Sequence, residues 1–153
     1  MGNQKTKAFT IIELLIVMAI IGILATVMMI VTNPGRQLAK ARDTDRQSDL
    51  FAILSAVYQY STEHSGELPD TDGDPETSNF PTEPTCIGTG GGCYNLGSAG
   101  EDDTIVPVYI PQMPYDPKTG ESSDTDYFIW VDENDRLQAS ASGETQDAIS
   151  VTR

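Results

Sequence analysis

The sequence predicts an α+β fold in which one long N-terminal helix packs on a small antiparallel sheet. Three observations favour this fold. Residues 14–31, LLIVMAIIGILATVMMIV, are eighteen apolar or small residues without a charge. Residues 36–63 continue a helical pattern, with apolar residues three and four positions apart. Residues 105–153 hold short extended runs separated by turn residues.

These patterns divide the chain into four parts. The first is a short basic leader, and the second and third are the apolar and amphipathic halves of the long helix. The fourth is an acidic head, whose first portion is a loop rich in Pro, Gly, Asp, Ser and Thr and whose second portion holds the sheet. The boundaries are 1–8, 9–33, 34–64 and 65–153, with the loop at 69–104 and the sheet at 105–153.

Charge is distributed unevenly along the chain. The formal net charge is -14, and residues 65–153 hold eighteen acids against three bases, whereas residues 1–64 hold five acids and six bases. Binding to nucleic acid requires Lys and Arg to displace counterions. We therefore expect no nucleic acid partner, and the head suits cations, basic partners or an external aqueous space.

The apolar run is long enough to cross a membrane. A helix over residues 9–33 is about 37 Å long, and hydrocarbon is about 30 Å thick. Lys5 and Lys7 precede the run, so the positive-inside rule predicts a cytoplasmic N-terminus and a head outside. A cleavable secretory signal is disfavoured because no A-x-A pattern follows the core.

Glu13 lies inside this apolar run. An ionisable group within a span costs on the order of 2–3 kcal/mol or more and usually marks function. A simple membrane anchor has no use for such a residue. The alternative is that Glu13 sits at the boundary of the lipid headgroups.

The stretch KAFTIIELLIVMAIIGILA, residues 7–25, resembles the class III signal and first helix of type IV pilins and type II secretion pseudopilins. The resemblance implies that a prepilin peptidase cuts between Ala8 and Phe9 and that Phe9 becomes N-methylated. Most relatives have Gly before the cut, so Ala8 is a departure. The freed amine of Phe9 can then pair with Glu13 of a neighbouring copy and fix the axial register of the subunits.

The same resemblance implies the pilin roll and a structural role, with no enzyme activity and no catalytic residues. The expected partners are the chain itself in a helical homopolymer, the prepilin peptidase, an inner-membrane assembly platform, and membrane lipid before assembly. The expected location is the cytoplasmic membrane, spanned once, and then an extracellular or periplasmic filament. The alternative is a minor tip pilin that acts as a binding or adhesion module. The segment MPYDPKTG…YFIWVDENDRL is similar to a looser pattern in pseudopilin G-like proteins.

Within the long helix, Pro34 and Gly35 predict a kink or an unwound turn. Beyond it, the charged residues favour a solvated face with pairs three or four positions apart. These residues are Arg36, Lys40, Arg42, Asp43, Asp45, Arg46 and Asp49. The apolar positions predict one stripe that packs under the sheet. These are Leu50, Phe51, Ile53, Leu54, Val57, Tyr58 and Tyr60.

In the head, Tyr127–Val131 and Leu137–Ala141 around DEND predict a hairpin, and residues 148–151 predict a third strand. The run IVPVYI, residues 105–110, carries a further extended signal. Cys86 and Cys93 predict a small disulfide loop if the head is outside the cytoplasm.

No cofactor is required by the sequence, but calcium stays open. Asp70, Asp72 and Asp74 alternate as at the start of a calcium loop. An EF-hand, however, has Gly at position six and Glu at position twelve, where this chain has Gly73 fourth and Pro81 twelfth. A solvated acidic loop is therefore favoured. Major pseudopilins bind calcium near their sheet, where this chain has Asp124, Asp126 and Asp132. His64 is the only histidine and has no nucleophile motif beside it.

Overall fold

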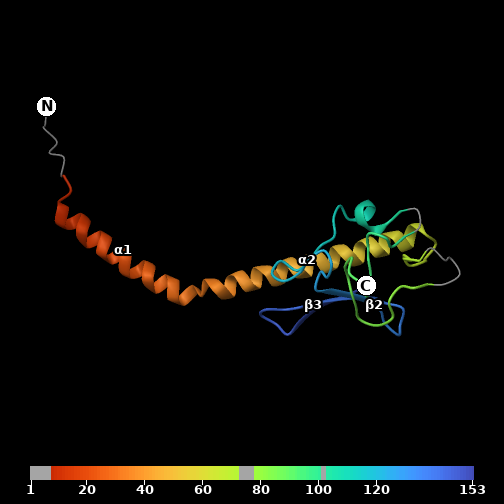
Figure 1. Cartoon of the computed structure of the whole chain (residues 1–153). Helices are drawn as coiled ribbons and strands as arrows, with labels where there is room; N and C mark the ends of the chain where they lie inside the picture. The colour runs from red at the N-terminus through yellow and green to blue at the C-terminus, as the bar shows by residue number, and fades with distance from the viewer. Residues whose placement is uncertain (1–7, 73–77, 101–102) are drawn as a thin grey trace, which may run out of the picture. The chain divides into compact units, whose positions relative to one another are not determined.

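The computed structural model describes residues 8–72, 78–100 and 103–153. The chain forms two compact units, one ending at Leu38 and the other spanning Ala39–Arg153. Figure 1 shows the elements in chain order. Asp74 lies outside the described residues.

Helix α1, Ile11–Thr32, is apolar all round and has no buried residue. It begins at Thr10, whose side chain accepts a hydrogen bond from the backbone N–H of Glu13, a standard N-cap. At 22 residues it is the one helix among the described residues that is long and apolar enough to cross a membrane.

One residue, Asn33, separates α1 from α2. Its backbone is left-handed, with φ 39° and ψ 76°, and its side chain accepts a hydrogen bond from the N–H of Arg36. Pro34 is then the first residue of α2. The first position of a helix tolerates proline because its missing N–H would have no partner there. The interruption of the helix therefore lies at Asn33, beside the Pro34–Gly35 pair that predicted it.

Helix α2, Pro34–Glu63, carries the head. It ends where Ser65 and Gly66 adopt positive φ and the N–H of Gly66 donates to the carbonyl of Ser61. Five residues of the predicted apolar stripe are buried: Leu50, Ile53, Leu54, Val57 and Tyr60. Phe51 and Tyr58, predicted to be part of that stripe, instead stay half exposed.

A four-stranded antiparallel sheet packs its apolar face against α2 (Figure 1). Its strands are β1 (Thr85–Cys86), β2 (Tyr127–Val131), β3 (Leu137–Ser142) and β4 (Ala148–Thr152), in the order β1-β2-β3-β4. Alternate side chains of the strands point into the core, as period-2 patterning requires. The core residues from the sheet are Tyr127, Ile129, Leu137, Ala139, Ala141, Ile149 and Val151. The predicted α+β fold, hairpin and third strand are confirmed.

Two parts of the head differ from the predicted boundaries. Residues Ile105–Tyr109, which carried an extended signal, form an irregular π-helical turn, η1. Pro107 has no N–H to donate to a ladder, which disfavours a central strand there. The sheet also reaches outside residues 105–153, because β1 comes from the predicted loop. That loop supplies core side chains as well, from Phe80, Ile87, Tyr94, Leu96 and Ala99.

Cys86 and Cys93 form the expected disulfide. The bond closes a glycine-rich loop that packs against the segment preceding β2. Carbon β atoms at Gly88 and Gly90 would lie 2.3 and 2.6 Å from the carbonyl oxygen of Ser123. The N–H groups of Thr89 and Gly90 donate to the carbonyls of Ser122 and Ser123. The glycines therefore allow two backbones to approach closely.

Candidate functional site

The first candidate site is the N-terminal end of α1. Ala8 and Phe9 are exposed and lie outside the helix, and Phe9 has 76% of its surface accessible. A peptide bond in non-helical, exposed backbone is open to a peptidase without unwinding the helix. Glu13 follows in the first turn of α1, where a carboxylate is stabilised by the helix dipole.

Glu13 makes no ion pair with any described residue. Every ion pair in the described part of the chain joins two residues within the range 42–144, so none involves Glu13. The residues around it on α1 are exposed and apolar. In an apolar environment this carboxylate therefore requires a cation from outside the described segment.

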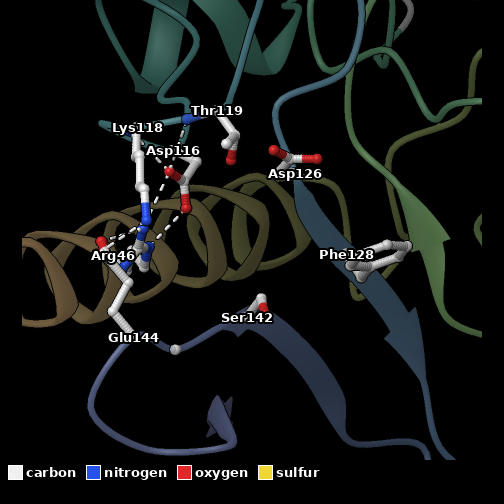
Figure 2. Close-up of a pocket in the computed structure, with 9 residues that line it drawn as sticks. Arg46, Asp116, Lys118, Thr119, Asp126, Phe128, Ser142 and Glu144 are labelled. Carbon is white, nitrogen blue, oxygen red and sulfur yellow. Dashed lines mark hydrogen bonds and ion pairs between the residues drawn. The ribbon is translucent and has the colours of Figure 1, made fainter.

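The second candidate site is a cluster of charges around Arg46, which is only 2% exposed (Figure 2). Its guanidinium contacts three carboxylates. Nη1 lies 2.7 Å from Asp43, Nε lies 2.5 Å from Asp116, and Nη2 lies 3.0 Å from Glu144. Because these acids come from α2, from the turn after residue 115 and from the loop after β3, one cation holds three segments together.

Further contacts complete the cluster around Glu144 and Asp43. Glu144 also pairs with Arg42 at 2.6 Å and with Lys118 at 3.1 Å. Asp43 accepts from the N–H groups of Glu144 and Thr145, both at 2.8 Å. The Arg46 network, defined as Arg42, Asp43, Arg46, Asp116, Lys118 and Glu144, holds three positive and three negative groups. It is neutral as a whole, so it has no net charge to attract an ionic ligand.

Hydrogen bonding shifts the pKa values in this network. The bond to Asp116 raises the pKa of Arg46 above its ordinary value, although burial acts in the opposite direction. Burial opposes ionisation of Asp43, but hydrogen bonds from Thr145, Glu144 and Arg46 together lower its pKa to about 2. The bond from Arg42 likewise lowers the pKa of Glu144. The acids therefore stay ionised at neutral pH.

A shallow pocket of about 320 Å³ opens beside the network, lined also by Thr119, Asp126, Phe128 and Ser142 (Figure 2). The charged groups of the Arg46 network are engaged with one another, whereas no ion pair in the described chain involves the carboxylate of Asp126. In the described chain, every buried side-chain nitrogen and oxygen has a hydrogen-bond partner. The Arg46 network can hold the turn after residue 115 and the loop after β3 on α2, and its polar groups already take part in these contacts.

The prediction of a solvated charged face on α2 was wrong for Asp43 and Arg46. Both are buried, at 5% and 2% exposed. Their partners Asp116 and Glu144 are 70 and 98 residues away from Arg46 in the chain, so no local pattern reveals the network. The only sequence signal was Asp116 in the PYDPKTG turn, where its side chain accepts from the N–H groups of Lys118 and Thr119.

The candidate calcium ligands form other contacts. Asp70 accepts from the N–H of Asp72, and Asp74 lies outside the described residues, so the predicted trio stays a prediction. Near the sheet, Asp132 pairs with Arg136 at 2.7 Å and accepts from Gln138. Asp124 accepts from the N–H of Asp126. Asp124 and Asp132 therefore have separate local contacts, and calcium binding near the sheet stays a prediction.

Asp124 also lies close to Cys86 and Cys93, a set with metal-ligand chemistry. The two sulfurs are joined to each other, however, and a disulfide offers no thiolate for a metal. His64 stacks on Tyr60 with ring centroids 3.9 Å apart, and its Nδ1 lies 2.9 Å from the carbonyl of Tyr60. These contacts keep His64 at the end of α2 as a packing residue.

Comparison with known proteins bears on the first site. Residues 3–29 match the family described as the prokaryotic N-terminal methylation motif. No curated protein and no solved structure matches the chain. The match confirms the resemblance to the type IV pilin and pseudopilin family. It supports a type IV pilin-like protein that is processed at its N-terminus, and it points to a structural, non-enzymatic role. The apolar α1 fits membrane anchoring of such a protein.

We predict that Arg46→Met destabilises the head by about 3–5 kcal/mol, because it leaves buried carboxylates without their shared cation. Urea unfolding of the full chain in detergent, followed by circular dichroism, measures the loss. The control is Arg136→Met, which removes an exposed pair with Asp132 and costs at most about 1 kcal/mol. Equal losses from the two variants would contradict a special role for the buried cation.

We also predict that the head loses stability in acid. The pKa of Asp43 is about 2 in the fold, below the value near 3.9 of an unfolded chain. The unfolded state therefore binds protons first as the pH falls, so the contribution of Asp43 is complete above pH 4 and disappears toward pH 2. Thermal midpoints at pH 7, 5 and 3 measure this. The expected result is little change from pH 7 to 5 and a clear fall by pH 3, and an unchanged or higher midpoint at pH 3 would contradict it.

Proposed function

We propose that this protein is a pilin or major pseudopilin that polymerises through α1 into a type IV pilus or type II secretion-like filament. The observation that carries the proposal is α1 itself. It is an apolar helix exposed along its whole length, with one acid, Glu13, in its first turn. The matched motif supplies the processing that makes a partner for that acid.

The proposed partner is the N-terminus of the next copy. Cleavage between Ala8 and Phe9 frees an α-amine, which carries a positive charge at neutral pH because its unperturbed pKa is about 7.7–8.0. In a staggered stack of helices, the amine of one copy meets Glu13 of another. Each charge alone is costly in an apolar bundle, and together they define one register.

The energetics of assembly favour such a specific contact. Moving α1 from lipid into a bundle of similar helices exchanges one apolar environment for another, which is close to neutral in hydrophobic free energy. Close packing and the ion pair must then select the arrangement, and an assembly platform in the inner membrane supplies the work. Before assembly, lipid holds α1 and the acidic head lies outside the membrane.

The head would form the outer surface of the filament. Residues 65–153 contain eighteen acids and three bases, and this net negative charge favours solubility in an aqueous space. The alternative role of a minor tip pilin is separated from a major one by abundance. A major subunit dominates purified filaments, whereas a tip subunit is nearly absent from them.

We predict that Glu13→Ala abolishes or severely reduces filaments while membrane insertion stays intact. The substitution removes one charge of the register pair and makes α1 more apolar. Electron microscopy of sheared filaments and membrane fractionation measure the two properties. Met18→Ala, a truncation on the same helix without a charge change, is the control and retains filaments. A normal filament yield from Glu13→Ala would rule out the pairing mechanism.

We predict that the subunit recovered from filaments begins at an N-methylated Phe9. Mass spectrometry of the N-terminal peptide measures both the cut and the methyl group, and the yield of that peptide measures abundance. Because cleavage alone creates the amine, an N-terminus that still begins at Met1 in assembled protein would refute the proposed function.

A further inference from the structure

A cleft of about 440 Å³ lies between α2 and the segment that follows η1. It is lined by Asp49 and Ala52 of α2 and by residues 110–115, with the sequence IPQMPY. All of these residues belong to the unit Ala39–Arg153. Small-molecule sites in proteins are usually apolar clefts of about 300–1,000 Å³ that hold a few polar groups. The volume and the lining of this cleft therefore fit a small ligand.

The walls of the cleft are mostly apolar and have little freedom to rearrange. Met113 packs against the hydrophobic core. Pro111 and Pro114 have fixed φ angles, which restricts the backbone of this segment. Ala52 contributes only a methyl group from α2, and the ring of Tyr115 is 54% exposed and open to a ligand. A cleft that is already formed costs less free energy to fill than one that must be ordered first.

Asp49 alone carries a charge among the residues that line the cleft. The hydroxyl of the buried Tyr127 donates to Oδ2 of Asp49 at 2.8 Å and fixes the carboxylate. Every buried side-chain oxygen in the described chain has a hydrogen-bond partner, and Oδ1 of Asp49 has none among the described residues, so Oδ1 is open to solvent. Asp49 also makes no ion pair with any of them. Oδ1 is therefore available to a donor on a ligand.

The charges that act on Asp49 favour a cation in the cleft. Burial raises the pKa of Asp49 above its ordinary value, and the negative charges of Asp45 and Asp116 raise it further, although the hydrogen bond from Tyr127 acts against them. The ionised carboxylate is thus disfavoured by its surroundings. A positive group bound beside it would offset part of that cost.

Other classes of ligand fit the cleft poorly. An anion would be repelled by the acids around it. A neutral apolar molecule would take Asp49 out of water without giving it a partner, which costs free energy. A calcium ion takes about six to eight oxygen ligands, whereas the cleft offers a single carboxylate among mostly apolar side chains. The ligand class that remains has a positive group and an apolar body.

We propose that this cleft binds a small organic cation, with a protonated amine or guanidinium at Oδ1 of Asp49 and an apolar or aromatic body against Met113 and the two prolines. The ring of Tyr115 can attract the same positive charge through its face. Because the volume is in the range of sites for whole small molecules, we assign a free ligand rather than a single side chain of a partner protein. The inference is independent of the proposed function, since no residue of α1 takes part.

We predict that phenethylammonium, a protonated amine joined to a phenyl ring, binds the full chain in nonionic detergent with a dissociation constant of about 1 mM or lower. Nuclear magnetic resonance measures this through the backbone amides of Gln112, Met113 and Tyr115, whose shifts report binding at the cleft. Phenethyl alcohol, which is neutral, and phenylacetate, which is an anion, bind about tenfold or more weakly, equivalent to about 1.4 kcal/mol, because neither pairs with Asp49.

Two pairs of variants test where the cation binds. Asp49→Asn keeps an acceptor for Tyr127 but removes the charge, so the affinity for phenethylammonium falls about tenfold. Its control, Asp45→Asn, removes an exposed acid of α2 outside the cleft and keeps the affinity within about twofold of wild type. Ala52→Phe fills the cleft and abolishes binding, whereas Ser48→Phe places the same ring at an exposed position outside it and retains binding. Thermal midpoints check that the variants fold.

The contrary outcomes are equally specific. Wild-type affinity in Asp49→Asn or Ala52→Phe, equal affinity for phenethyl alcohol, or no shift at the three amides would overturn the inference. Tighter binding of N-acetylargininamide than of phenethylammonium would assign the cleft to a side chain of a partner protein and overturn the free ligand. These titrations use the unassembled chain. A wild-type chain that forms no filaments would therefore refute the proposed function and leave this inference unchanged.

Discussion

The head is organised by one buried cation. Arg46 is almost fully removed from water and touches carboxylates from α2, from the turn after residue 115 and from the loop after β3. An uncompensated charge in that position would cost several kcal/mol, so the folded head is stable only with all three segments in place. The apolar core joins α2 to the sheet through contacts that do not depend on orientation. The hydrogen bonds of the network do depend on orientation, because each has a defined donor and acceptor. Together they fix the loops and the sheet on α2 within the unit Ala39–Arg153.

The two parts of the chain suit different environments, one apolar and one aqueous. In α1 no side chain is buried, so that helix is stable only in lipid or among other helices. The head has the opposite composition, with acids in large excess. In the proposed filament, close packing of the apolar helices favours contact between copies, whereas the acidic heads repel each other.

Local sequence patterns were enough to predict those helices and strands that form because of neighbouring residues in the chain. Hydrophobic length predicted α1, and alternation with turn residues predicted the β2–β3 hairpin and β4. The failures have a non-local cause. Arg46 and Asp43 looked like surface charges because their partners Asp116 and Glu144 are far away in the chain. Phe51 and Tyr58 looked like core residues because apolarity alone does not reveal how wide a face the sheet covers. β1 was missed because a two-residue strand in a glycine-rich loop carries no periodic pattern.

The network also explains how α2 and the loops find a unique alignment. A slide of α2 by one turn would keep part of the apolar packing, because Leu50 would take the place of Leu54 and Ile53 that of Val57. A slide that brings Arg42 into the place of Arg46 would bring Ala39 into the place of Asp43. The N–H groups of Glu144 and Thr145 donate hydrogen bonds to Asp43. After such a slide they would have no acceptor. The opposite slide would bring Leu50 among the carboxylates of Asp116 and Glu144. Either error leaves buried polar groups unsatisfied, at about 1–3 kcal/mol each, so the ionic residues specify the register that the apolar ones stabilise.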